Sequence, residues 1–328
     1  KNFPILRRGA IRGGISFKKK TTRVRPYGTL ASRTIGDVYG DANNGKNGLE
    51  LEYDSLLKGE PGLYIRRKKA GRNADIIIQE AINGYDIVST IDIDLQETAE
   101  RELRYQLERT EAQRGTVVLM EVKTGKIRAI SNLIRQRDGS YTESENIAMN
   151  SQIEPGSTFK IITLAASLEE KSINLFEDTF YDGGSVNVDG ARIKCWKSGG
   201  HGSETFLQVV QNSCNPGFVL MGQKLGTNKL YEYVEAFGFM EKTGVDLNGE
   251  AKGIMFDLED IGPVEQATIS FGQGISVTPI QQVTGVSAAI NGGYLYTPYV
   301  VKYIVEGETN DIMYENKSKL KRQHISIN

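Results

Sequence analysis

Glu154-Pro-Gly-Ser157-Thr-Phe-Lys160 leads directly into an apolar run that ends at Glu169. This run predicts a helix over residues 159–169, and the three-residue spacing places Ser157 and Lys160 on one face of its first turn. A serine hydroxyl is a weak nucleophile, and a lysine whose pKa is lowered by burial can serve as its base. Amides at the helix start would also stabilise an oxyanion near Ser157. A capping serine beside a surface lysine gives the same string, so the pair alone does not establish a catalytic site.

A second polar group, Ser213-Cys214-Asn215, precedes Pro216-Gly217 at the junction of two helices expected within residues 205–225. Serine and amide side chains two residues apart can point the same way in an extended turn. They could then pass a proton and hold a substrate carbonyl or amide. An ordinary Ser/Asn turn explains the same residues.

The chain alternates predicted strands and helices from about residue 86 onward. Strands are expected at 86–93, 115–122 and 126–131, the last two as a hairpin, and helices at 94–113 and 281–289. Residues 1–85 are instead rich in glycine, charge and turn signals. The pattern predicts an α+β domain over residues 86–328 that follows an extended, strand-poor module over residues 1–85.

Composition excludes few functions. The 328 residues are 39% hydrophobic and 25% charged, as in ordinary globular proteins, and the net charge of −1 gives no reason to expect a nucleic-acid partner. Residues 1–36 hold ten Lys and Arg and no acid, so they form either a solvated arm or a segment near an anionic membrane or wall polymer. The sequence shows neither a run of 18 apolar residues that could span a membrane nor a signal peptide.

Taken together, these motifs resemble those of class B penicillin-binding proteins. Ser157-Thr-Phe-Lys160 resembles the first catalytic motif of the family, and Ser213-Cys-Asn215 resembles the second. Similar stretches cover most of residues 8–300: Arg8-Gly-Ala-Ile, Arg25-Pro-Tyr-Gly-Thr-Leu-Ala, Gly48-Leu-Glu50, Tyr53-Asp54, Thr90-Ile-Asp-Ile-Asp-Leu-Gln96, Gly115-Thr-Val-Val, Lys123-Thr-Gly-Lys-Ile and Ser270-Phe-Gly-Gln-Gly-Ile-Ser-Val-Thr-Pro279. The resemblance implies a penicillin-binding/serine β-lactamase-like transpeptidase domain, with a sheet flanked by helices, after a linker or dimerisation-like module.

The resemblance also implies an activity, partners and a location. The protein would be a serine D-Ala-D-Ala transpeptidase that cross-links peptidoglycan through an acyl-enzyme on Ser157. Lys160 would act as the base, while Ser213 and Asn215 would relay a proton and position the substrate. Its ligands would be peptidoglycan stem peptides and β-lactam antibiotics that mimic them, and its partner a membrane glycosyltransferase. It would lie on the extracytoplasmic face of the cell membrane, anchored by an N-terminal helix that is not present in this chain.

Two departures from the family pattern are visible. After Ile11-Arg12-Gly13 the family continues into a loop carrying Asp-Arg-Asn-Gly, whereas Gly14 follows here. The third catalytic motif, a Lys-Thr-Gly string on a strand that lines the site, is expected well after Pro298. The two copies present, at residues 123–125 and 242–244, lie before that point. We therefore expect the domain in this chain to lack the Lys-Thr-Gly strand, and the chain itself to be acylated poorly.

Two other functions remain open. A serine β-lactamase or β-lactam sensor shares the first two motifs, although the long linker module argues against it. A non-catalytic scaffold that binds a glycan polymerase would be consistent with the absent third motif. Within the family, the Cys195-Trp and Gly200-His stretches most resemble the sporulation-specific members of clostridial type.

Cysteine and histidine are rare, yet Cys195, His201 and Cys214 fall within twenty positions. Thiolate and imidazole are the ligands that a tetrahedral zinc ion prefers, so we expect a structural Zn²⁺ here. Asp182 is the expected fourth ligand, because a cysteine often stands at the matching place in relatives of clostridial type, and Asp189 is the fallback.

The position of Cys214 inside the second motif has a geometric consequence. If Ser213 and Asn215 face the substrate, the side chain between them should face away, and a metal there would brace the motif from behind. A Cys195–Cys214 disulfide and two free thiols are the alternatives.

Overall fold

The computed structural model describes residues 23–40, 43–69, 72–323 and 325. The chain divides into two compact units, residues 1–30 and 31–328. In the first unit, residues 23–30 include a turn in which the amide of Gly28 donates to the carbonyl of Arg25. Most of the basic stretch and the departure at Gly14 lie outside the described residues. All elements below belong to the second unit.

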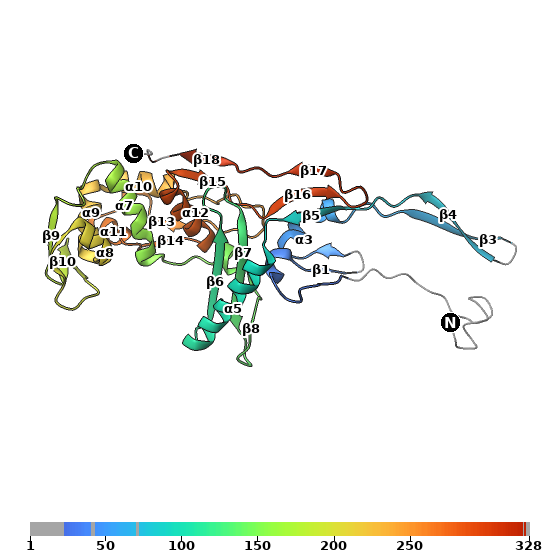
Figure 1. Ribbon diagram of the computed structural model, residues 1–328, viewed down its shortest axis with the longest axis horizontal. Coiled ribbons are helices and arrows are strands. Elements are labelled where there is room, and N and C mark those ends of the chain that lie inside the picture. The colour runs from blue at the N-terminus through green and yellow to red at the C-terminus, as the bar shows by residue number, and fades with distance from the viewer. Residues whose placement is uncertain (1–22, 41–42, 70–71, 324, 326–328) are drawn as a thin grey trace. The chain divides into compact units, whose positions relative to one another are not determined.

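Helices and short strands alternate along the second unit (Figure 1). The described helices are α2 Ser32–Ile35, α3 Gly48–Glu52, α4 Asp54–Leu57, α5 Ile93–Thr110, α6 Ile147–Asn150, α7 Lys160–Glu169, α8 Phe206–Gln211, α9 Asn215–Leu225, α10 Thr227–Ala236, α11 Pro263–Ile269 and α12 Pro279–Ile290, with 3-10 turns η2 Gly156–Phe159 and η3 Leu258–Asp260. The described strands are β1 Val38–Tyr39, β2 Asn44–Gly45, β3 Leu63–Lys69, β4 Arg72–Gln79, β5 Tyr85–Ser89, β6 Arg114–Met120, β7 Ile127–Arg135, β8 Tyr141–Thr142, β9 Thr179–Asp182, β10 Ser185–Val188, β11 Ala191–Lys194, β12 Gly202–Thr205, β13 Ile254–Met255, β14 Ile275–Ser276, β15 Tyr294–Tyr296, β16 Val301–Glu306, β17 Ile312–Glu315 and β18 Leu320–Gln323.

The linker module is richer in strands than the sequence predicted. β3 and β4 form a long antiparallel hairpin in which Tyr64 pairs with Ile77 and Ile65 with Ile76. Aromatic and β-branched cross-strand pairs of this kind stabilise a two-stranded ribbon. The strands were missed because a basic run and three consecutive isoleucines hide the alternation that marks a half-buried strand.

The antiparallel sheet β6-β7-β8 is covered on both faces. Leu103 and Leu107 of α5 pack with Leu133 on one face, and α6 and α12 contact β6 from the other. Residues 129–133 of β7 are buried in succession, as expected for a strand that is covered on both faces. The predicted hairpin and the helix before it are thus confirmed. That helix is capped by Asp92, whose carboxylate accepts from the amides of Asp94 and Leu95.

A second sheet joins segments that lie far apart in the sequence. β5, close to the linker module, pairs with β16, which in turn pairs with β17. Short alternating strands give no signal of their long-range partners, so the sequence predicted β5 but not this sheet.

The helix that carries Lys160 lies inside the helical part of the fold. α7 contacts α9, α10 and α12, and its Ile162 and Ala166 are fully buried. Phe159, at the start of the helix, packs edge-to-face on Phe239 with ring centroids 5.3 Å apart. This packing explains the apolar body of residues 159–169 and fixes the turn that precedes it.

Candidate active site

The proposed nucleophile, Ser157, is exposed in the 3-10 turn η2, immediately before α7. Gly156 before it has a positive φ of 55°, and its amide donates to the carbonyl of Gly272 at 2.9 Å. A Cβ atom added to Gly272 would lie 2.1 Å from the carbonyl oxygen of Gly156. A glycine at position 272 therefore lets a second segment support the turn that carries Ser157.

This second segment, residues 270–282, holds the Ser157 turn at other points as well. Ile153 and Val277 form an antiparallel bridge, and the side-chain amide of Gln282 donates to the carbonyl of Thr158 at 3.2 Å. The sequence pointed to this segment only through its resemblance to the family. Contacts across more than a hundred residues leave no local signal.

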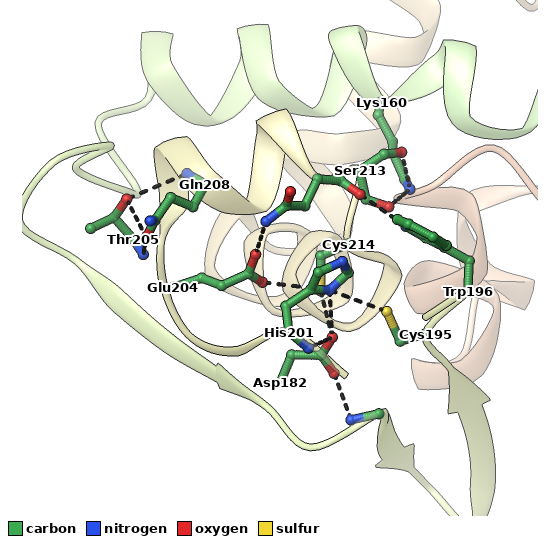
Figure 2. Close-up of polar contacts among 12 residues, drawn as sticks. Lys160, Asp182, Cys195, Trp196, His201, Glu204, Thr205, Gln208, Ser213 and Cys214 are labelled. Carbon is green, nitrogen blue, oxygen red and sulfur yellow. Dashed lines mark hydrogen bonds and ion pairs between the residues drawn. The ribbon is translucent and has the colours of Figure 1, made fainter. Parts of the chain in front are cut away.

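Lys160 points away from solvent and connects the two predicted motifs (Figure 2). Its Nζ donates to the carbonyl of Ser213 at 2.8 Å and to Ser213 Oγ at 2.9 Å. It also donates to Asn215 Oδ1 at 2.7 Å. The residue is only 4% exposed, and burial lowers the pKa of its amine to about 8. At pH 7 about a tenth of the Lys160 side chains are therefore the free base that general-base catalysis requires.

The second motif adopts a strained turn between α8 and α9. Ser213 has a φ of 50°, a left-handed conformation that serine rarely adopts, and α9 begins at Asn215. The side-chain amide of Asn215 also approaches the carbonyl of Lys194 at 3.4 Å. The structure thus brings together Lys160, Ser213 and Asn215, one helical turn from Ser157.

Neither Lys-Thr-Gly string lies on a strand beside Ser157 in the described part of the chain. The first forms the turn between β6 and β7, where the amide of Gly125 donates to the carbonyl of Glu121. In the second, the buried carboxylate of Glu250 accepts from the amide and hydroxyl of Thr243, each at 2.6 Å. Both strings thus lie in structural loops.

Asp182, Cys195, His201 and Cys214 converge behind the second motif (Figure 2). One potential ligand atom from each lies within 4.8 Å of the others. His201 Nδ1 lies 2.9 Å from Asp182 Oδ2 and 3.4 Å from Cys195 Sγ, and Cys214 Sγ lies 3.3 Å from the same Asp182 oxygen. Both cysteines are free and buried.

Each member of this cluster comes from a different loop or strand end. Asp182 ends β9, Cys195 follows β11, His201 precedes β12, and Cys214 immediately precedes α9. Asp189, the fallback ligand, lies in the turn between β10 and β11 and is not part of the cluster. Burial opposes ionisation of Asp182, but hydrogen bonds from the cysteines, His201 and the amide of Gly184 hold its pKa down at about 2.

Cys214 belongs both to this cluster and to the second motif. The thiol of Cys214 points to Asp182, while Ser213 and Asn215 on either side of it contact Lys160. Glu204, which the sequence did not suggest, extends this link. It lies 3.9 Å from His201 Nδ1 and accepts a hydrogen bond from the side chain of Asn212, the residue before Ser213.

Comparison with known families agrees with this arrangement. The penicillin binding protein transpeptidase domain matches residues 115–328, and the penicillin-binding protein dimerisation domain matches residues 7–89. The chain belongs to the penicillin-binding proteins. With both modules present it is a class B member, as the sequence motifs predicted. The domain boundary at residue 85 remains a prediction.

Relatives extend over nearly the whole chain. It is 45% identical over 324 residues to stage V sporulation protein D of Bacillus subtilis, covering 95% of this chain and 50% of that protein. It is 28% identical over 292 residues to the peptidoglycan D,D-transpeptidase FtsI of Escherichia coli, covering 87% and 49%. The chain therefore spans about half the length of the curated relatives it matches.

Solved structures share the fold. Penicillin-binding protein 3 of Mycobacterium tuberculosis, complexed with ampicillin, superposes with a TM-score of 0.78 at 26% identity, over 91% of this chain and 64% of that one. Penicillin binding protein 2X of Streptococcus thermophilus gives a TM-score of 0.79 at 26% identity, over 92% and 46%. Within the described residues, no helix combines the length and apolar character needed to cross a membrane.

The close approach of Gly272 to Gly156 predicts a specific cost. We expect Gly272→Ala to slow labelling by a fluorescent penicillin about a hundredfold, since displacing a reacting group by ~1 Å has an effect of that size. Labelling rates and thermal unfolding of full-length protein measure the effect. Gly139→Ala is the matched control, because Gly139 also has a positive φ of 86° but has open space around its Cβ position. Equal labelling by the two variants would contradict the support that we assign to Gly272.

Proposed function

We propose that this protein is a serine D,D-transpeptidase that cross-links peptidoglycan through an acyl-enzyme. The observation that supports this proposal best is the buried Lys160 amine. It contacts Ser213 and Asn215 while it lies one turn from the exposed Ser157. Two comparisons support the same proposal. One relative is named a peptidoglycan D,D-transpeptidase, and one structural relative was solved in complex with ampicillin.

The residues divide the reaction into two half-reactions. Ser157 Oγ attacks the carbonyl of the penultimate D-Ala of a stem peptide as its proton passes to the neutral amine of Lys160. The peptide bond breaks, the acyl group stays on Ser157, and D-Ala leaves with a proton delivered through Lys160 and Ser213. An amine of a second stem peptide then attacks the ester, gives up its proton along the same route and releases Ser157. Asn215 holds the amide of the donor peptide.

A β-lactam would enter the first half-reaction only. Opening of its strained amide acylates Ser157, but the leaving amine stays attached and blocks the second stem peptide. Slow hydrolysis of this adduct is what separates a transpeptidase from a β-lactamase. A protein that forms no adduct would instead fit the alternative of a non-catalytic scaffold.

Context for the reaction comes from the relatives. By analogy with stage V sporulation protein D we propose a role in the cell wall made during sporulation. A membrane-anchored position on the extracytoplasmic face, and a membrane glycosyltransferase as partner, remain part of this proposal.

We predict that penicillin modifies Ser157. Full-length protein incubated with benzylpenicillin should gain one adduct, which peptide mass spectrometry should place on the peptide that contains Ser157. Ser157→Ala should abolish the adduct, whereas Ser151→Ala should not, because within the described residues the Ser151 hydroxyl donates to the side chain of its neighbour Asn150 and not to a group of the site. A modified residue elsewhere would refute the assignment of the nucleophile.

The pKa of Lys160 predicts the pH dependence of acylation. Because the neutral amine is the base and its pKa is about 8, the acylation rate should rise roughly tenfold per pH unit below that value and level off above it. Lys160→Arg should lose at least about a hundredfold in rate, since a guanidinium stays protonated at any pH used. Stopped-flow acylation between pH 6 and 9 measures the profile. A rate that does not change with pH would exclude Lys160 as the base.

We also propose that Asp182, Cys195, His201 and Cys214 hold a structural zinc ion. Bonds of about 2.0–2.3 Å in a tetrahedron separate neighbouring ligands by about 3.3–3.8 Å. The distances of 2.9, 3.3 and 3.4 Å within the cluster are close to that range. Two thiols, one imidazole and one ionised carboxylate make a closed set of four. The ion would neutralise the thiolates and tie together the loops behind the second motif.

Zinc binding predicts both a composition and a loss of stability. Protein purified without added metal should contain about one equivalent of zinc by elemental analysis, and chelation should lower its melting temperature. Cys214→Ser and Cys195→Ser should each reduce the zinc content, while Asp189→Ala, which removes a carboxylate that is not part of the cluster, should not. Less than about a tenth of an equivalent of zinc, with no titratable thiols after denaturation, would indicate a disulfide instead.

A further inference from the structure

The carboxylate of Glu143 connects the linker module to the transpeptidase domain. Its Oε2 accepts from Ser32 Oγ at 3.0 Å and from the amide of Arg33 at 3.1 Å, while its Oε1 accepts from the amide of Asn132 at 2.8 Å. The backbone carbonyl of Glu143 also accepts from Arg33 Nε at 2.8 Å. Ser32 and Arg33 belong to α2, whereas Asn132 belongs to β7. One residue therefore holds together two segments that lie far apart in the sequence.

The surroundings of this carboxylate make its hydrogen bonds important. Glu143 is partly buried, and burial raises the pKa of its carboxyl group, while the hydrogen bonds from Arg33, Asn132 and Ser32 oppose that shift. A carboxylate removed from water is unfavourable unless its oxygens have donors, and donors that lose their acceptor are unfavourable in turn. The carboxylate and its three donors therefore hold one another in place.

Asn132 extends the connection from β7 to α6. Its Oδ1 accepts from the amide of Ala148 at 2.9 Å, and its Nδ2 donates to Asn146 Oδ1 at 3.2 Å. Asn132 and Ala148 are fully buried, so water does not compete for the bond between them. Only residues 151–156 separate the end of α6 from Ser157. The contacts of Glu143 thus lead by way of one buried side chain to the helix before the nucleophile.

The short segment between α6 and Ser157 is itself held by its neighbours. The amide of Ser151 donates to the carbonyl of Ile147 at 3.2 Å, and Ile153 pairs with Val277 in an antiparallel bridge. Closely packed segments of this kind transmit small displacements. A shift of α6 would therefore change the position of the turn that carries Ser157.

We propose that Glu143 is a positioning residue for acylation, because it ties the linker module to α6 through Asn132. This inference rests on the proposed acylation of Ser157. With the carboxylate in place, the linker module and α6 hold the reacting serine in one arrangement. Without the carboxylate, the folded protein would still bind a donor, but Ser157 would occupy the attacking position less often. The rate constant of acylation should then fall while the affinity for the donor stays the same.

The test measures binding and acylation separately in full-length protein. Stopped-flow reaction with a fluorescent penicillin over a range of concentrations gives both the dissociation constant and the acylation rate constant. Glu143→Ala should lower the rate constant about tenfold and leave the dissociation constant unchanged, since a displacement smaller than the ~1 Å that costs about a hundredfold should have a smaller effect. Glu143→Gln keeps one acceptor oxygen and should recover part of the loss.

A double-mutant cycle tests the route through the linker module. Ser32→Ala removes one donor to the carboxylate and should lower the rate constant about threefold in the unaltered protein. In Glu143→Ala the same change should have no further effect, because the acceptor is already gone. Glu145→Ala is the matched control, since it removes an exposed carboxylate from the same loop, and should leave both constants unchanged.

A purely structural role of Glu143 predicts a different result. The melting temperature and the reactive fraction would fall, but the molecules that react would do so with an unchanged rate constant. That result, or an equal effect of Ser32→Ala with and without Glu143, would overturn this inference and leave the proposed function intact. Glu143→Gln keeps the test valid if Glu143→Ala does not fold. Failure of the unaltered protein to form any adduct would overturn the proposed function, and this inference with it.

Discussion

The site depends on the contact of one buried amine with two side chains more than fifty residues further along the chain. Lys160 starts a helix that is packed on several sides, and its Nζ reaches both Ser213 and Asn215. Burial makes the charged form costly, so the same packing that fixes the lysine also lowers its pKa. The packing around this helix therefore both stabilises the helical core and lowers the pKa of Lys160.

Support for this contact comes from two directions. On one side, the carbonyl of Gly272 accepts from the amide of Gly156 and so supports the turn that carries the exposed Ser157. On the other side, Cys214 follows the strained residue Ser213 and is itself one of the four potential metal ligands, so it links this turn to the cluster. The left-handed conformation of Ser213 is unfavourable by itself, and a structural ion bound at this cluster would offset that free-energy cost.

Local patterns predicted the parts of the site, and the fold determined their contacts. The helix after Ser157, the junction at Ser213 and the four members of the cluster followed from motifs or from resemblance to the family. The support from Gly272, the role of Glu204 beside His201 and the hairpin β3–β4 did not. The first two depend on tertiary contacts between residues far apart in the sequence, which leave no periodic signal. In the hairpin, the basic run and the consecutive isoleucines hide the alternation of polar and apolar residues that marks a strand.

The pKa of the Lys160 side chain tests most directly whether Lys160 is the base that activates Ser157. It can be measured by NMR titration of the lysine Cε and Nζ resonances in isotope-labelled protein, with Lys160→Arg used to assign the signal. We predict a midpoint near pH 8, which moves toward the ordinary lysine value of about 10.4 when the protein is unfolded. A midpoint above pH 10 in the folded protein would show that Lys160 stays protonated, and would contradict its role as the base that activates Ser157.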